Sequence, residues 1–459
     1  MRRDEFAAYD VRMAGRKRWL IVLLAILGVA LGIYCAREPL ERGISAIVIY
    51  RAHVFTPPPP TPGESRFHRL LADARFYWDF AEIRQTREKR LKLLNPLLKP
   101  LVKEIGRRQA AGEGMQYSMH IYREIRWRLN FTPDVASTRR RIEDLRQSLN
   151  KPEQQRQAAQ QQASDGSWGM GFNVWYLKLY YSVEDGLDTG GMPEPQYPLK
   201  FLDRINSPQK LTAQLDDDLH DDFTKTGVFN REELDETFSA LARLLFKVKQ
   251  TGYPFHPELK GALRQFVQNW QNPETGFWGQ WLVDRNGRVW KMDDMAMTFH
   301  VVSDLQGQVE HKDLIARRLL QLDNVNFPAG IRFNGHYENH LNWDVVKLFR
   351  SAWPVMDEET RQQARTEISH MLDWCLSQSY QPDGSFKVSE LDETVGDAYS
   401  YGVSFLREAG YFQRDKRFWT DQDFPQAKAV HDRIEAKIQS IGLNDPGLKD
   451  TYNTLHAME

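Results

Sequence analysis

The chain has 459 residues, which is enough for two or three domains and a large buried core. Its formal net charge is −1, so no overall basic field indicates a nucleic-acid partner. Its two cysteines are too few for a disulfide framework or a cysteine-bound metal cluster, and nothing in the composition indicates a cofactor.

Residues 19–36 form an almost wholly apolar run of 18 residues, just long enough to cross the hydrocarbon core of a bilayer. More basic residues precede this run than follow it, which places residues 1–18 in the cytoplasm under the positive-inside bias. A cleaved signal peptide is the alternative, but Tyr34-Cys35-Ala36 is a poor small-residue cleavage site. We therefore predict an uncleaved signal anchor in the lipid bilayer of the cytoplasmic (inner) membrane, with the carboxy-terminal part extracytoplasmic, in the periplasm.

Residues 37–64 are predicted to be a linker, because Pro57–Pro60 forms the centre of a stiff polyproline spacer. Residues 65–164 are charged and helix-prone, and we expect a helical stalk there. Pro96 and Pro100 interrupt its helical pattern, which predicts that one helix ends and another begins at this point.

Residues 165–459 are predicted to be one domain of repeated helical hairpins. Gly276, Gly330 and Gly384 lie in successive turns, and each glycine is 54 residues from the next. A fixed period of this length is typical of supersecondary units that bury one another's faces. Apolar residues with helical spacing precede the first turn, namely Leu263, Phe266, Val267 and Trp270. A short β-hairpin around Asn286-Gly287 is the expected exception to the helical pattern.

Two of the turns share a further pattern, formed by Gln271, Gly276 and Trp278 and by Gln381, Gly384 and Phe386. These turns resemble the Q-x(n)-G-x-W turn of the α/α-toroid superfamily, which includes squalene cyclases (terpenoid cyclases) and protein prenyltransferases. Similar (α/α)6 barrels occur in glycoside hydrolases and polysaccharide lyases. The resemblance implies an all-α fold in which an α/α toroid follows the transmembrane helix and the helical stalk. It also implies that the glutamine and the aromatic ring of each turn hold adjacent hairpins together.

Terpenoid cyclase or prenyltransferase chemistry is the least favoured consequence of this resemblance. The repeat region has no D-x-D-D acid motif. Asp217, Asp218 and Asp221 fit the D-D-x-x-D motif that binds magnesium diphosphate in that superfamily, but they lie in an acidic run where a chance match is expected.

Three polar clusters follow the turns, and each has a purely structural alternative. In the first cluster, Asp293 and Asp294 open an apolar helix that continues to His300. Capping of the helix dipole explains these two carboxylates as well as catalysis does.

In the second cluster, helical spacing would stack His336, His340 and Asp344 on one face, with Glu338 near them. Two histidines at this spacing can chelate zinc, but no fourth ligand is evident and we predict no metal. Hydrogen bonding to a sugar, or proton transfer by a histidine or by Glu338, is the favoured interpretation. Helix capping and polar pairing in the core are the alternative.

In the third cluster, Asp392 and Glu393 start a helix that continues through Asp397 to Tyr401. The three clusters occupy comparable places in successive repeats, so in a closed ring their side chains would converge on one end of a central cavity. Glycosidases need two carboxyl groups about 5–10 Å apart around the scissile bond, and facing repeats would supply such a pair.

We therefore predict an anchored enzyme that acts on a polysaccharide or envelope glycan, as a hydrolase or a lyase. The alternative is a non-catalytic scaffold that binds a glycan or a protein partner through the same end of the domain. The predicted catalytic residues are Asp293, Asp294, Glu338, His340 and Asp392. The predicted substrate-binding residues are Trp278, His300, His336, Asp344, Glu393, Asp397 and Tyr401.

Overall fold

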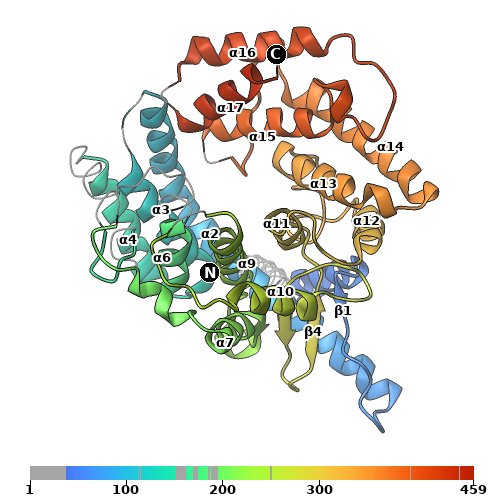
Figure 1. Ribbon diagram of the computed structural model, residues 1–459. Helices are drawn as coiled ribbons and strands as arrows, with labels where there is room; N and C mark the ends of the chain where they lie inside the picture. The colour runs from blue at the N-terminus through green and yellow to red at the C-terminus, as the bar shows by residue number, and fades with distance from the viewer. Residues whose placement is uncertain are drawn as a thin grey trace, which may run out of the picture. The chain divides into compact units, whose positions relative to one another are not determined.

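Figure 1 shows the computed structural model of the chain. The structure describes residues 38–458 except positions 112, 114, 151–161, 169–173, 184–186, 188–194, 249, 250, 393 and 444. The chain forms two compact units. The first comprises Thr61–Gln85 with the described residues up to His53, and the second comprises Val54–Pro60 with Thr86–Glu459.

The first unit is helical. Residues 38–51 form a helix, and helix α2 (Arg66–Ala110) begins in this unit and continues into the second. Within the unit, the Arg42 guanidinium lies 5.4 Å from the centroid of the Trp78 ring and forms an ion pair with Glu82 at 3.0 Å. These contacts join the first helix to the beginning of α2.

No helix in the part of the chain that the structure describes is both long and apolar enough to cross a bilayer. This finding overturns the prediction of a single-pass inner-membrane protein with a signal anchor and a periplasmic domain. The predicted span, residues 19–36, and the predicted cytoplasmic tail, residues 1–18, lie outside the described residues.

Helix α2 runs through both prolines at which we predicted a break, so that prediction is wrong. A proline inside a helix removes a backbone hydrogen bond and costs about 3 kcal/mol or more. Here that cost is offset by a core shared with α3 (Gln116–Phe131) and α4 (Val135–Ser148) in the second unit. The residues that α2 buries in this core are Leu94, Leu98, Leu101 and Ile105.

The second unit is mostly helical, which confirms the all-α class. The helices after α4 are α6 (Trp175–Ser182), α7 (Pro208–Leu219), α8 (Phe223–Thr226), α9 (Arg231–Phe246), α10 (Leu259–Trp270), α11 (Met295–Asp304), α12 (Lys312–Gln321), α13 (Asn339–Ala352), α14 (Glu358–Trp374), α15 (Val395–Glu408), α16 (Ala427–Ile441) and α17 (Pro446–His456). Short helical turns occur at Lys200–Arg204, Trp353–Val355, Cys375–Ser379 and Arg414–Lys416.

The helices of the second unit pack in a regular alternation (Figure 1). Helices α9, α11, α13, α15 and α17 contact one another in succession, and we call them the inner row. Helix α10 packs on α9, α12 packs on α13 and α14, and α16 packs on α17. The repeats are therefore a succession of stacked helical hairpins.

A small sheet has two of its four strands, β3 (Trp281–Val283) and β4 (Val289–Met292), between α10 and α11 in the chain order. Its strands are arranged in the order β1 (Phe55–Thr56), β4, β3 and β2 (His220–Asp221). Strands β3 and β4 form the antiparallel hairpin that was predicted around Asn286-Gly287. Strand β1 pairs antiparallel with β4, and β2 pairs parallel with β3. The end of β4 brings the chain directly to the aspartates that precede α11.

Two of the three predicted glycine turns, at Gly276 and Gly384, have a backbone conformation that favours glycine, whereas Gly330 does not have a positive φ angle. Gly276 and Gly384 adopt φ angles of +75° and +87°, which favour glycine. A Cβ atom at Gly384 would also lie 2.3 Å from the carbonyl oxygen of Arg433. The Gln271 amide donates to the carbonyl oxygens of Gly276 at 2.9 Å and Glu310 at 3.0 Å. The turn after α10 is thereby fastened to the chain just before α12.

Candidate functional site

Buried charged groups connect α9 to α11 in the inner row. Arg231 and Asp235 lie one turn apart on α9, and both face α11. Arg231 Nε donates to Asp294 at 2.6 Å, and Arg231 Nη2 donates to Asp235 at 3.0 Å. Asp294 is fully buried and also caps α11 by accepting a hydrogen bond from the Met297 amide at 3.0 Å. Asp294 therefore has the capping role that was one of its two predicted roles.

The same group of charges holds His300 in its protonated form. His300 Nδ1 lies 2.7 Å from Asp235 Oδ1. Burial alone would lower the pKa of His300, but the Asp235 carboxylate raises it to about 10. Burial also opposes the charge on Asp235, yet His300 and Arg231 hold the pKa of Asp235 below its ordinary value. His300 is therefore a paired imidazolium at neutral pH, with 27% of its side chain exposed.

Five rings of α11, α13 and α15 form a continuous group, which we call the ring cluster: Phe299, His300, His340, Trp343 and Tyr401. The centroid of Phe299 is 5.6 Å from that of His300 and 5.4 Å from that of Trp343. The centroid of Tyr401 is 6.1 Å from that of Trp343. His340 and Tyr401 are stacked, with centroids 4.0 Å apart and ring planes inclined by 8°. Phe299 is buried and the other four rings are partly exposed.

Asp344 lies beneath the ring cluster. Its carboxylate is 3.7 Å from His340 Nε2, and its residue is only 2% exposed. Burial raises the pKa of Asp344 far above its usual range. Burial and the nearby His300 charge lower the pKa of His340 to about 4. At neutral pH the ring cluster therefore combines a charged His300 with a neutral His340, next to a buried Asp344 whose pKa is raised by burial.

Glu338 and Asp392 lie near the amino-terminal ends of α13 and α15. Glu338 is the residue before α13 and accepts hydrogen bonds from the His340 and Leu341 amides at 2.8 and 3.4 Å. Burial raises the pKa of Glu338 to about 7, and the Asp392 charge adds to this effect. Burial also raises the pKa of Asp392 to about 6, and Asp392 accepts from the Ser389 amide at 2.6 Å.

The remaining predicted site residues lie apart from the ring cluster. Asp293 is fully buried and pairs with Arg318 of α12 at 2.7 Å, whereas the adjacent Asp294 turns to α9. Trp278 is buried, and its indole N–H donates to the Val267 carbonyl of α10 at 2.9 Å. His336 and Asp397 also lie outside the ring cluster.

His336 is exposed in a loop, because α13 begins only at Asn339. The predicted helical stack of three residues is therefore wrong, and His340 and Asp344 alone share the face. Asp397 forms a capping box with Thr394 at the start of α15. Glu393 lies outside the described residues.

The structure adds five residues that the sequence analysis missed: Arg231, Asp235, Phe299, Trp343 and Lys347. Trp343 and Lys347 follow His340 at the helical spacing of three and seven residues, so the one-face pattern of α13 contained a signal for them. Arg231 offered no comparable signal, because it is 63 residues from Asp294 in sequence.

No group of three or more histidine, cysteine, aspartate or glutamate side chains within the described residues is placed to hold a metal ion. The residues of the D-D-x-x-D match have separate surroundings. Asp217 is exposed, whereas Asp218 is buried and accepts from Gln214 at 2.8 Å. Asp221 accepts from the Asn230 amide at 2.8 Å. These contacts do not favour diphosphate binding.

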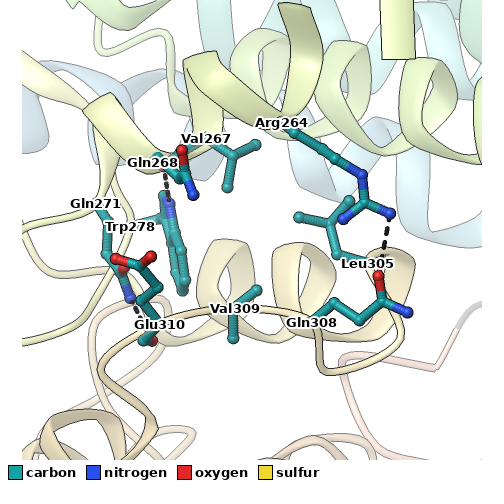
Figure 2. Close-up of a pocket in the computed structure, with 9 residues that line it drawn as sticks. All are labelled: Arg264, Val267, Gln268, Gln271, Trp278, Leu305, Gln308, Val309 and Glu310. Atoms are coloured by element: carbon teal, nitrogen blue, oxygen red, sulfur yellow. Dashed lines mark hydrogen bonds between the residues drawn. The ribbon is translucent and has the colours of Figure 1, made fainter. Parts of the chain in front are cut away.

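Figure 2 shows a small pocket between α10 and the segment that joins α11 to α12. Its volume is about 70 Å³, whereas small-molecule sites are usually about 300 Å³ or larger. The lining includes Gln271 and Trp278, which fasten the turn, and Arg264, which donates to Gln308 across the opening at 3.1 Å. The pocket is a packing gap beside the turn, and no residue of the ring cluster lines it.

No family model, no curated protein and no solved structure matches this chain. The resemblance to the α/α-toroid superfamily therefore rests on the turns alone. Neither the comparisons nor the geometry provides support for an enzyme or for an activity on carbohydrate, which corrects the expectation of a carbohydrate-active hydrolase. Three of the predicted catalytic carboxylates do not support hydrolysis, because Asp293, Asp294 and Glu338 are all buried and bound to cations or backbone amides.

Proposed function

We propose that the chain is a non-catalytic glycan-binding protein and that the ring cluster is its binding surface. The observation that carries this proposal is the continuous contact among Phe299, Trp343, Tyr401 and His340 across three helices. The face of a sugar ring presents C–H groups that pack well on aromatic rings, and its hydroxyls bond to polar groups at the edges.

The surroundings of the ring cluster support a binding role because they hold the rings in place. His300 is fixed by Asp235, which accepts from Arg231, and Arg231 is held in turn by Asp294. Tyr401 is fixed by its stacking on His340. A surface whose side chains are already ordered loses little conformational entropy when a ligand binds.

The same contacts favour binding over catalysis. A general acid or base must reach the proton that it transfers, to within about 3 Å or through one water. Glu338 has the pKa that such a role requires, but it is only 5% exposed and its carboxylate accepts from two backbone amides of α13. The partly exposed imidazoles of the cluster are poorly matched to proton transfer at neutral pH, because the pKa of His300 is raised to about 10 and that of His340 is lowered to about 4.

The inner row also supports a finer proposal about the fold, that the hairpins belong to an α/α toroid. Its support is the alternation of inner and flanking helices and the Gln271 contacts at the first turn. An experimental structure in which the inner-row helices do not pack in succession from α9 to α17 would contradict this proposal.

The function is tested by isothermal titration of the whole chain with soluble polysaccharides: dextran, xylan, polygalacturonate and alginate. We expect saturable binding to at least one polymer. Trp343→Ala should weaken that binding about tenfold, which corresponds to about 1.4 kcal/mol. The matched control is Trp353→Ala, a partly exposed tryptophan just after α13 that lies outside the cluster and contacts Phe418.

Three results would refute the proposal. The first is the absence of binding to every polymer, and the second is an equal loss of binding in the two tryptophan variants. The third is the release of reducing ends or unsaturated sugars during long incubation, because a non-catalytic protein leaves the polymer intact.

A further inference from the structure

A lysine lies beside the ring cluster. Lys347 is on α13, one turn beyond Trp343, and is partly exposed. Its Nζ is 5.3 Å from the ring centroid of Phe299 and 5.3 Å from that of Trp343. The same ammonium donates to the Ser303 hydroxyl of α11 at 2.9 Å. Two rings and one hydroxyl therefore position this cation at the surface that we propose for glycan binding.

Lys347 has no carboxylate within ion-pair distance among the residues that the structure describes. Acidic groups act on it from farther away, but each has a nearer partner or a charged form that burial disfavours. Asp304 is bound by Lys247 at 2.8 Å, and Glu408 is bound by Arg350. Asp344 is buried, and burial raises its pKa well above its ordinary value, which disfavours its charged form.

Desolvation makes the lack of a close counter-ion significant. Burial lowers the pKa of Lys347, which shows that its surroundings do not fully compensate for the water it has lost. His300, the other cation of this surface, is already paired with Asp235. Lys347 is therefore the cation of this surface that a bound anion would stabilise most.

We propose that the ring cluster binds an acidic glycan, in which the carboxylate of a uronic acid pairs with Lys347 while the sugar ring packs on Trp343. This inference rests on the proposed function and specifies its ligand class. A carboxylate is favoured over a densely sulfated chain because Lys347 is a single cation, and the other cation of this surface, His300, is already paired with Asp235. One cation suits one anionic group.

The test compares polygalacturonate with its carboxyl-reduced form, in which each carboxylate has become a hydroxymethyl group and the backbone is unchanged. We expect the wild-type chain to bind the acidic polymer about tenfold more tightly than the reduced polymer, since a charge-assisted hydrogen bond contributes about 1.5–3 kcal/mol. This preference should decrease as the salt concentration rises.

Two variants assign the preference to Lys347. Lys347→Met keeps the aliphatic stem against the rings and removes the charge, so it should lose the preference and still bind the reduced polymer. Lys347→Arg keeps the charge and should retain the preference. Thermal unfolding of both variants verifies that the fold is intact.

The possible failures separate the two proposals. If the reduced polymer binds as tightly as polygalacturonate and Trp343→Ala abolishes both, the glycan surface stands and the acidic ligand is wrong. Loss of both polymers in Lys347→Met with an unchanged melting temperature would also contradict the charge role. If dextran sulfate binds more tightly than polygalacturonate through Lys347, the assignment to a carboxylate is wrong. If no polymer binds, both proposals are wrong.

Discussion

Replacing Arg231 with methionine tests whether the charged groups between α9 and α11 stabilise the second unit. Arg231 is 9% exposed and bonds Asp294 at 2.6 and 3.2 Å and Asp235 at 3.0 Å. The substitution leaves two carboxylates without this cation, and Asp294 is fully buried. Breaking a buried ion pair by removing one partner costs about 3–5 kcal/mol. We expect a loss near the upper end of that range.

The assay is urea unfolding followed by tryptophan fluorescence at pH 7 and at pH 5. Burial raises the pKa of Asp294 and Arg231 opposes this rise, so the pKa rises further in the variant. The folded variant then holds a proton that the unfolded chain, with an aspartate pKa of about 3.9, releases. Its stability therefore falls as the pH rises above about 4, by about 1.4 kcal/mol per pH unit for each proton. The loss relative to wild type should be smaller at pH 5 than at pH 7.

The control is Arg146→Met, which removes an exposed ion pair whose side chains are 52% and 50% exposed. That change should cost less than about 1 kcal/mol. Adding Asp294→Asn to the Arg231 variant should restore part of the stability, because the amide needs no counter-ion. A loss within about 1 kcal/mol of the control, or a loss that is equal at both pH values, would show that these charges do not stabilise the fold as argued.

Three further predictions concern stability. The folded-state pKa of His300 is raised to about 10 from its ordinary 6.5, so its stabilising effect is complete below pH 6.5 and is lost as the pH rises towards 10. Urea midpoints between pH 7 and pH 9 should fall in the wild type and fall less in His300→Gln; parallel curves would contradict this. Gly384→Ala should lower the melting temperature, because its Cβ would meet the Arg433 carbonyl, whereas Gly287→Ala has open space and should have the smaller effect. Gln271→Ala should cost about 1–3 kcal/mol by leaving the Gly276 and Glu310 carbonyls without this donor, and an unchanged urea midpoint would show that the glutamine does not fasten the turn.

The candidate site shows which of its residues could be predicted from local sequence patterns. The sequence nominated His300, His340, Asp344 and Tyr401, and the structure brings these four into one group. The same patterns treated Asp293 and Asp294 as one pair, but their side chains bond to different helices. Adjacent residues at a strand end point to opposite sides, and a cluster in sequence is therefore not a cluster in space.

Some features of this protein were determined by the sequence alone. The turn at Gly384 needs a residue without a Cβ, and the hairpin at Asn286-Gly287 needs a residue that accepts positive φ. Helical stripes such as Leu263, Phe266, Val267 and Trp270 are buried as predicted. These features depend on interactions among residues a few positions apart, which the sequence displays directly.

Tertiary structure decided the rest. The pairing of Arg231 with Asp294, the stacking of His340 on Tyr401 and the place of Lys347 between two rings all depend on how α9, α11, α13 and α15 pack. Tertiary packing also keeps α2 helical across Pro96 and Pro100. These interactions join groups that are distant in sequence. Their contribution to stability comes from burial and charge, and it appears only when the helices pack together.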